Sequence, residues 1–319
     1  MALKSLSISA KATLELHALN NEGAEGNALM TRMVDIVDQE GRLHTVNAVS
    51  GDMLKHIQAE HLFQHAVENK LPLCNGCLKF DANRICADEE FTKRADFKSD
   101  TLDSLILGEA LKKCVVDDVE GILITSEIGK KARSIARKSC VEFGWAVGIP
   151  DRVHTESYFH AKYVPEGRGK GSGAGENLGQ NIFHRPASSG QYAIVANIDP
   201  LRVGRNDITL EYAVDEEQRR LRIKALLTSV LNTFVRLNGA HRNTQMPHLV
   251  NLSGVIATSE SSLPAPSISA LNDGFVDQIK GTAGSLNKLA GRDVVQTYEF
   301  ANLSEFAAVM VDQFHKVSV

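Results

Sequence analysis

The sequence has 319 residues, of which 43% are hydrophobic and 23% are charged, a composition typical of an ordinary globular protein with a substantial core. No stretch approaches the roughly 18 apolar residues that a membrane helix needs, so we expect no membrane contact and a cytoplasmic location. Five cysteines, an odd number without a secretion signal, argue against a disulfide framework and indicate free thiols or metal ligands.

Charge is distributed unevenly along the chain. The total is −4, but the segment from Lys130 to Arg185 holds ten Lys or Arg and five Asp or Glu, a net +5 that leaves −9 for the remainder. A locally basic segment on an acidic chain is typical of a groove for a polyanion, with repulsion of non-specific contacts elsewhere.

The N-terminal part predicts two strands joined by a loop. From Leu6 to Leu16 apolar and polar residues alternate, which predicts a half-buried strand. The turn-forming residues from His17 to Asn27 predict a surface loop, and Met30 to Val37 predicts the second strand.

The next feature is a strand that turns into a helix between Asn47 and Ala66. Ser50 is the expected N-cap of this helix, followed by Gly51, and the free backbone N–H groups there can bind an anion such as phosphate. Lys55 and His56, one turn into the helix, would add positive charge. The alternative is an ordinary capped helix with Lys55 in solvent.

A cysteine-rich stretch follows, in which Cys74 and Cys77 enclose an Asn-Gly turn and Cys86 comes later. Such a turn resembles a zinc knuckle, with thiolates about 2.3 Å from the metal. His61, His65, His56 or Cys114 could supply the fourth ligand, and we take His61 as the first choice. No nearby acidic residue suits the role of general base, so a zinc here would be structural; a plain turn with reduced thiols is the alternative.

The middle of the chain carries the basic segment and a glycine-rich stretch. Lys130, Lys131, Arg133, Arg137 and Lys138 form either a solvated face or part of a polyanion groove. Farther along, Ser157 to Val164 and Gln180 to Arg185 alternate aromatic, apolar and basic residues, which predicts the two strands of a long hairpin. Aromatic and basic side chains on a hairpin are typical of single-stranded nucleic-acid binders. The glycines between the strands lack the spacing of a nucleotide-phosphate loop.

The C-terminal part alternates strands and helices. Strands are expected at Gln191 to Ile198 and Val250 to Thr258, and helices at Glu216 to Leu237 and Leu303 to His315. The first of these helices is expected to turn its basic residues, Arg219, Arg220, Arg222 and Lys224, to a solvated face. Together with the N-terminal elements this order is compatible with an α+β fold of the split βαβ, ferredoxin-like type.

Several segments, in order along the chain, resemble one known family. The phrase AVSGDMLKH, together with SISAKATLELHALNNEGAEGN, QNIFHRPASSGQYAIVANIDPLRVG and NGAHRNTQMPHLVNLSGVIATSESSLPAP, resembles the DevR family, of the Cas seven family of backbone subunits in type I CRISPR Cascade complexes, as in subtypes I-A and I-B. Asp52 stands where family members more often carry Asn, and its carboxylate would repel a phosphate.

The resemblance implies a modified RNA-recognition-motif (RRM) palm from residues 1–66 and 187–319, a helical finger insertion at 67–130 and a β-hairpin thumb at 150–186. It also implies RNA-binding roles in the loop after the first strand, at the start of the helix, along the basic segment and on the thumb. The residues are His17, Asn20, Asn21, Ser50, Gly51, Lys55, His56, Lys130, Lys131, Arg133, Arg137, His154, His160, Lys162, Gln180, Phe183 and Arg185.

The expected function is that of a non-catalytic subunit. Copies would bind CRISPR RNA head-to-tail, present it to target DNA and contact other Cascade subunits. No cofactor would be required, although the cysteine-rich stretch could hold a structural zinc. Two alternatives are a metal-dependent ribonuclease like type III backbone subunits and a free-standing zinc-dependent enzyme. The loop after the first strand offers Glu22 and Glu25 but no aspartate, which argues against the ribonuclease.

Overall fold

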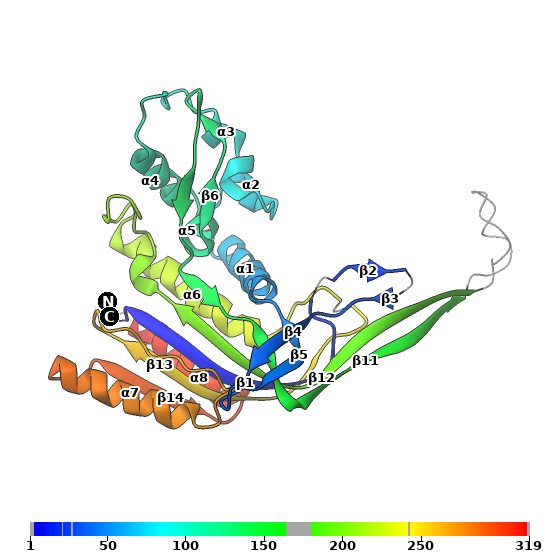
Figure 1. Ribbon diagram of the computed structural model, residues 1–319. Coiled ribbons are helices and arrows are strands. Elements are labelled where there is room, and N and C mark those ends of the chain that lie inside the picture. Colours follow the sequence, from blue (N-terminus) through cyan, green and yellow to red (C-terminus); the bar gives the residue numbers. More distant parts are fainter. Residues whose placement is uncertain (1–2, 21, 27, 164–179, 242, 318–319) are drawn as a thin grey trace.

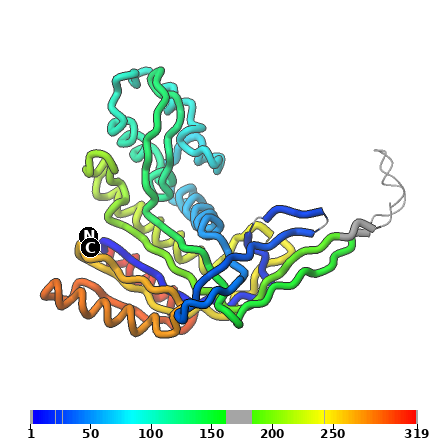
Figure 2. The backbone as a smooth tube through the Cα atoms, viewed as in Figure 1, coloured from blue at the N-terminus to red at the C-terminus, as the bar shows by residue number. Residues whose placement is uncertain are grey.

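The structure is a computed structural model that describes residues 3–20, 22–26, 28–163, 180–241 and 243–317. Figure 1 and the backbone trace in Figure 2 show a twisted sheet, a lobe that rises above it and a long hairpin that extends to one side. We call residues 70–139 the inserted lobe, and the outer parts of β11 and β12, residues 153–163 and 180–190, the long hairpin.

The main sheet is antiparallel along the path β14-β13-β1-β12-β11-β5-β4, and the short β10 also pairs with β12. β1 is a central strand, because it pairs with β12 on one side and with β13 on the other over most of its length. The strands of this path are β1 (Ser5–His17), β4 (Met33–Val37), β5 (Leu43–Val49), β10 (Val141–Phe143), β11 (Ala146–Tyr163), β12 (Gln180–Ile198), β13 (His248–Ser259) and β14 (Val295–Phe300). The two-residue strands β2 (Ala24–Glu25) and β3 (Ala28–Leu29) join its margin, where β3 pairs with β12.

Helices cover both faces of the sheet. On one face α1 (Gly51–Glu68), α6 (Glu216–Val235) and α8 (Leu303–Lys316) share a core with β1, β12 and β13. On the other, α7 (Phe275–Ala290) packs against Ala193, Val255 and Ala257. The apolar periodicity of α6 and α8 predicts these helices within two residues at each end.

β1 differs from its prediction because it is buried on both faces. Leu6 and Ile8 enter the main core, and the alternating Ser7 and Ser9 are also buried. The Ser7 Oγ donates to the Pro266 carbonyl (2.6 Å), and the Ser9 Oγ accepts from the Ile268 amide (3.2 Å). The segment after β13 thus covers the predicted solvent face and satisfies its hydroxyls.

The inserted lobe consists of short helices closed by two small hairpins. Its elements are α2 (Asn75–Leu78), η1 (Arg84–Ala87), α3 (Glu89–Thr92), α4 (Asp103–Lys113), α5 (Val115–Glu120), β6 (Ile122–Ile124), β7 (Glu127–Ile128), β8 (Lys131–Ala132) and β9 (Ile135–Arg137). Because β9 returns to pair with β6, the lobe continues past residue 130, where the sequence had placed its end.

A buried ion network fixes the lobe to the rest of the molecule. Asp118, fully buried on α5, accepts hydrogen bonds from Arg137 and Arg222, both at 2.8 Å, and from the amide of Gly204. Arg222 lies on α6, on the face that the sequence predicted to be solvated. That prediction is wrong: the arginine is 0% exposed because it reaches Asp118 and the carbonyls of residues 111 and 112.

The long hairpin grows directly out of the sheet. β12 is continuous from Gln180 to Ile198, so the two strands predicted at Gln180–Arg185 and Gln191–Ile198 are one. A bulge in β11 between Gly148 and Val153 redirects the pair, and opposite it Gly190 has φ +142°. A Cβ at this glycine would lie 2.2 Å from the Arg152 carbonyl oxygen, so this crossing requires glycine. The predicted glycine-rich connection, residues 167–179, lies outside the described residues.

None of the helices formed by the described residues combines the length and the hydrophobicity of a transmembrane span. The short remaining element is η2 (Pro200–Arg202), which follows β12 and leads to α6.

Candidate nucleic-acid interface and metal centre

The corner between β5 and α1 has the predicted cap but not the predicted open anion site. The Ser50 Oγ accepts from the Met53 amide (3.2 Å), which confirms the N-cap. The Ser50 amide donates to the Asn20 Oδ1 (3.0 Å), and the Asn20 side chain donates to the Ala48 carbonyl (2.7 Å). Both side chains are buried, so Ser50 and Asn20 fasten the loop after β1 to this corner and do not face a ligand.

Gly51 has a packing role at the same corner. A Cβ there would approach the Phe143 carbonyl oxygen to 2.5 Å, so α1 can begin against β10 only with glycine at this position. Gly51 is buried, and the structure therefore does not offer it to a phosphate.

Lys55 and His56 do face a concave surface. A pocket of about 280 Å³ is lined by Asp52, Lys55 and His56 from α1 and by Phe80 and Arg84 from the lobe. The Lys55 Nζ donates to the Glu120 carbonyl (2.9 Å), and burial lowers the pKa of the lysine. The Arg84 guanidinium donates to the Gly121 carbonyl. Both cations retain further N–H groups beside the pocket.

A larger pocket of about 770 Å³ adjoins it along α1. His56 and Phe80 line both pockets, and the larger one adds Phe63 from α1 and Asn238 and Asn243 from the loop after α6. The ring centroids of Phe63 and Phe80 are 5.2 Å apart, and those of His56 and Phe80 are 5.7 Å apart. We call these two pockets the α1 groove; its rings and amides match the chemistry that recognises unpaired bases.

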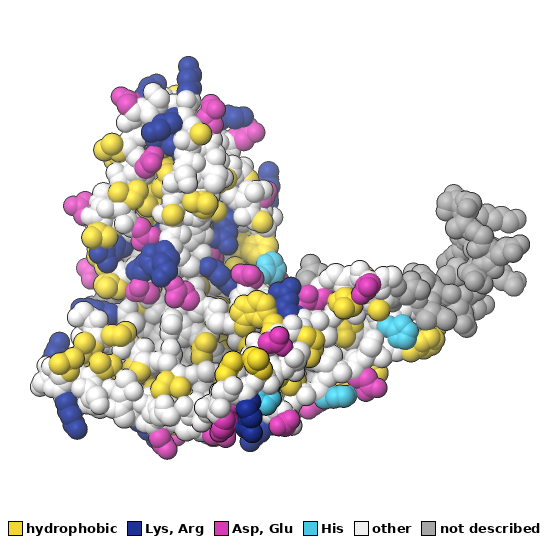
Figure 3. All heavy atoms as spheres, viewed as in Figure 1, with side chains coloured by type: hydrophobic (Ala, Val, Ile, Leu, Met, Phe, Trp, Pro, Cys, Tyr) yellow, Lys and Arg dark blue, Asp and Glu magenta, His cyan; other side chains and the backbone are white. Residues whose placement is uncertain are grey.

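The long hairpin carries a ladder of stacked side chains. His160 lies opposite Phe183 in the register, and their rings are parallel within 9° at 5.5 Å between centroids. The Arg185 guanidinium lies 4.8 Å from the centre of the Phe183 ring. On the other face, Phe159 is 61% exposed and meets His184 edge to face. Figure 3 shows histidines along the hairpin, whereas basic and acidic side chains intermingle on the lobe.

Two contacts join the base of the hairpin to the α1 groove. Arg185 donates to the Thr244 Oγ1 (3.2 Å), and the Gln245 side chain donates to the Pro186 carbonyl (2.9 Å). Both partners lie in the loop after α6, of which Asn243 lines the groove. Groove, loop and hairpin thus form one continuous surface.

For the remaining candidates on the hairpin, the structure gives the exposure of His154 and the backbone pairing of Lys162 and Gln180. His154 is exposed, with its Nε2 3.8 Å from a carboxylate oxygen of Glu156. Lys162 pairs with Asn181 and Gln180 with Tyr163 in the backbone register, which places both positions toward the outer end of the hairpin.

Two of the predicted RNA-binding residues in the basic segment are buried instead. Arg133 donates to Asp103 and to carbonyls of residues 98, 101 and 128, and Arg137 donates to Asp118 and Asp207. Their side chains are at most 1% exposed, so these two arginines do not line a polyanion groove. Among the basic residues of that segment, Lys130, Lys131 and Lys138 are exposed.

His17 is also a core residue. It is 3% exposed, packs edge to face against Tyr192 at 5.0 Å, and burial lowers its pKa to about 4. A neutral, enclosed imidazole does not bind phosphate, so the prediction for His17 is wrong. Asn21 lies outside the described residues.

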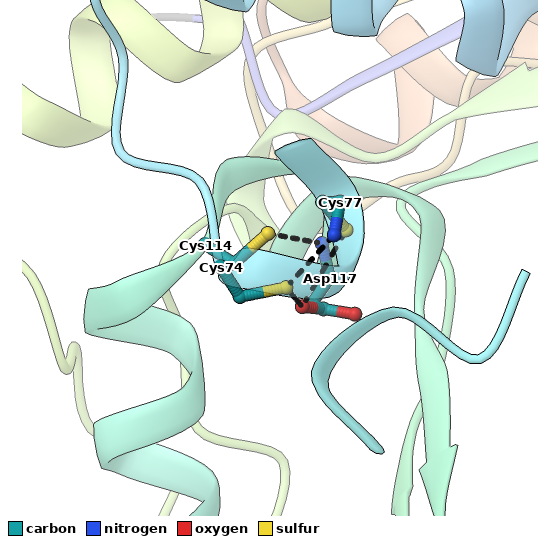
Figure 4. A group of neighbouring side chains, drawn as sticks. All are labelled: Cys74, Cys77, Cys114 and Asp117. Atoms are coloured by element: carbon teal, nitrogen blue, oxygen red, sulfur yellow. Dashed lines mark hydrogen bonds between the residues drawn. The ribbon is translucent and has the colours of Figure 1, made fainter. Parts of the chain in front are cut away.

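The lobe also contains a candidate metal centre. Cys74, Cys77, Cys114 and Asp117 are all buried, and their ligand atoms lie within 4.8 Å of one another (Figure 4). The sequence had named Cys74 and Cys77, with Cys114 among the alternatives. Cys86 is outside this group, near the Leu123 carbonyl (3.8 Å), and the Nε2 of His61 contacts the Arg236 carbonyl (2.9 Å), so both predicted ligands are wrong.

Asp117 was missed, although the sequence contained a signal for it. Cys114-x2-Asp117 repeats the spacing of Cys74-x2-Cys77, and each pair opens a short helix. Burial raises the pKa of the Asp117 carboxyl well above its usual range. The groove residues Phe63 and Phe80 were missed for a different reason: an apolar side chain at helical spacing predicts core equally well.

The family comparison matches most of the chain. The family model described as "CRISPR-associated negative auto-regulator DevR/Csa2" matches residues 8–280. The chain belongs to the DevR/Csa2 family of CRISPR-associated proteins. The resemblance to the DevR family, inferred from the sequence motifs, is confirmed. No protein in the curated collection matches the sequence.

Three solved structures are similar to this DevR/Csa2 family member. One chain, described as "CRISPR RNA-guided surveillance complex", has 13% identity and a TM-score of 0.49 and covers 98% of this chain and 99% of its own. A second, from a complex described as pre-nicking, has 15% identity and a TM-score of 0.46, and covers 89% of this chain and 88% of its own. Csc2 of Thermofilum pendens has 14% identity and a TM-score of 0.41, and covers 98% of this chain and 85% of its own.

Proposed function

We propose that this protein is a non-catalytic subunit that binds CRISPR RNA in a type I Cascade complex, within the cytoplasm. Membership of a CRISPR-associated family supports the setting. The observation that carries the RNA-binding role is the surface that runs from the α1 groove through the loop after α6 to the stacked ladder of the long hairpin. Aromatic faces beside cations bind single-stranded RNA largely independently of sequence.

The architecture supports the division into palm, finger and thumb. The order β13-β1-β12-β10, with α1 and α6 as the intervening helices, corresponds to the 4-1-3-2 order of a split βαβ, RRM-like palm. The inserted lobe would be the finger and the long hairpin the thumb. In this assignment Lys55, His56 and Arg84 hold the RNA backbone in the groove, while His160, Phe183 and Arg185 contact bases.

A protruding hairpin also suits polymerisation. Residues 153–163 and 180–190 extend beyond the sheet, so the exposed Tyr158 and Phe159 are free to reach a second copy on the same RNA. A head-to-tail contact of this kind repeats along a strand and leaves the ends for other Cascade subunits. Sequence specificity toward target DNA would come from base pairing by the guide.

The test is co-expression of the full chain with a CRISPR array, followed by sizing and sequencing of the bound RNA. We expect oligomers that carry uniform guide-length RNA. A monomer that stays free of RNA when guide RNA is added at low salt would overturn the proposal.

The ribonuclease alternative is less well supported. Glu22, in the loop after β1, is paired with Arg32 at 3.2 Å, and Asn20 beside it is committed to the corner before α1. Incubation of the assembled complex with complementary RNA and magnesium separates the two functions. We expect the RNA to stay intact, whereas cleavage at regular intervals would establish a nuclease.

A further inference from the structure

Two helix starts in the inserted lobe face each other and present matched side chains. Cys74 is the N-cap of α2 and Cys77 lies three residues on; Cys114 is the N-cap of α5 and Asp117 lies three residues on. Residues at this spacing project from one side of a helical turn. The lobe brings the two turns together across 36 intervening residues, and Figure 4 shows the four side chains converging.

The distances between the four side chains fit ligands of a single ion. With metal–sulfur bonds of about 2.3 Å, a tetrahedral site places its ligand atoms about 3.5 to 3.8 Å apart. The Asp117 Oδ2 lies 3.3 Å from the Cys74 Sγ and 3.9 Å from the Cys77 Sγ, and every ligand atom lies within 4.8 Å of the others.

Asp117 provides an independent sign that a ligand is needed. Its side chain is 0% exposed, and its Oδ1 has no hydrogen-bond partner. Within the described part of the chain, no Lys, Arg or His forms an ion pair with Asp117. An enclosed carboxylate without a directly paired cation is costly, and a divalent ion in the centre of the group would remove that cost.

We propose that Cys74, Cys77, Cys114 and Asp117 bind one structural Zn²⁺. Three thiolates favour zinc over the hard ions Mg²⁺ and Ca²⁺, and four protein ligands leave no open position for catalysis. Backbone amides complete the arrangement, because the Cys77 amide donates to the Cys74 Sγ (3.3 Å) and the Asp117 amide donates to the Cys114 Sγ (3.5 Å).

The position of the site indicates what the metal would stabilise. It joins α2 to α5, and Asp118 and Glu120 on α5 bind Arg222 and Lys55. Cys77 itself lines the smaller pocket of the α1 groove. Zinc would therefore hold the wall of the groove in place.

The test is the zinc content of the purified full-length chain, measured by mass spectrometry after expression with zinc and a reductant. We expect one zinc per chain in the wild type and in Cys86→Ser, the matched control, and loss of zinc in Cys114→Ser. A wild type without zinc, whether its thiols are reduced or disulfide-linked, overturns the proposal, as does an iron–sulfur absorption spectrum.

A second measurement stays informative if a cysteine variant misfolds. Chelation should lower the thermal midpoint of the wild type, and one equivalent of zinc should restore it. Asp117→Asn should weaken zinc retention and lower the midpoint. A buried carboxylate in a metal-free core would instead be relieved by the neutral amide, so an unchanged or raised midpoint contradicts the zinc site.

Discussion

The basic segment at residues 130–138 and the long hairpin both have sequences typical of an RNA-binding surface. The arginines of the segment are nevertheless buried, whereas the stacked side chains of the hairpin lie at the surface. Arg133 and Arg137 turn inward to carboxylates and carbonyls of the lobe and the η2 region. On the hairpin, His160, Phe183 and Arg185 stack mainly on one another and remain at the surface. The density of charge along a sequence therefore does not identify a binding face; the position of the acidic partners decides it.

The sharpest way to test this contrast is to remove a cation from the buried network. Arg137→Ala leaves Asp118 and Asp207 with fewer donors, and breaking a buried pair in this way costs about 3 to 5 kcal/mol of unfolding free energy. Urea denaturation measures the loss. Its neighbour Lys138 is exposed beside Glu142, so Lys138→Ala should change stability by less than about 0.5 kcal/mol. Similar losses in both variants would contradict the buried role of Arg137.

The buried His17 tests the same contrast between core and surface, with a histidine in place of an arginine. Its folded-state pKa is lowered by burial from 6.5 to about 4, so the unfolded chain binds the proton more readily. Stability should therefore fall as the pH drops below about 6.5 and continue falling to about 4, by roughly 2 to 3 kcal/mol at pH 4.5. Urea denaturation at pH 7.5 and 4.5 should show a smaller difference in His17→Phe than in the wild type. An equal difference would mean that His17 does not carry this pH dependence.

The hairpin should respond in binding and not in stability. The double variant His160→Ala, Phe183→Ala removes a stacking surface, which is worth about 1 to 3 kcal/mol for each base. Guide-RNA affinity should fall accordingly, while the urea midpoint stays the same. Leu289→Ala, an exposed apolar residue on α7 beyond the sheet, is the control and should leave both values unchanged. Unaltered RNA affinity in the double variant would show that the stacked side chains of the hairpin do not contact RNA.

The smallest effect is expected from the exposed lysines at the turn between β7 and β8. If Lys130 and Lys131 contact phosphates, the double alanine variant should weaken RNA binding equally for all sequences. It should also reduce the slope of log affinity against log salt by about 0.7 for each lost contact. Lys112→Ala, a solvent-exposed lysine on α4, is the control. A slope unchanged from the wild type would limit the RNA path to the groove and hairpin.

The sequence by itself determined the local elements and the family. Alternation identified β1 and the hairpin strands, helical periodicity identified α6 and α8, and Ser50 marked the start of α1. These features depend on neighbours within a few residues, which is why local patterns report them. The motif order along the chain was sufficient for the DevR/Csa2 assignment.

Only the tertiary structure decided which polar residues serve the core and which the surface. Arg137 and Arg222 are buried because Asp118 lies on a helix 19 and 104 residues away from them in sequence. Cys114 and Asp117, not Cys86 and His61, complete the candidate metal centre because two separate helix starts meet there. Residues that look alike in the local sequence pattern therefore have different partners in the structure. Because these partners are distant in sequence, only the packing of the whole fold determines which residues meet.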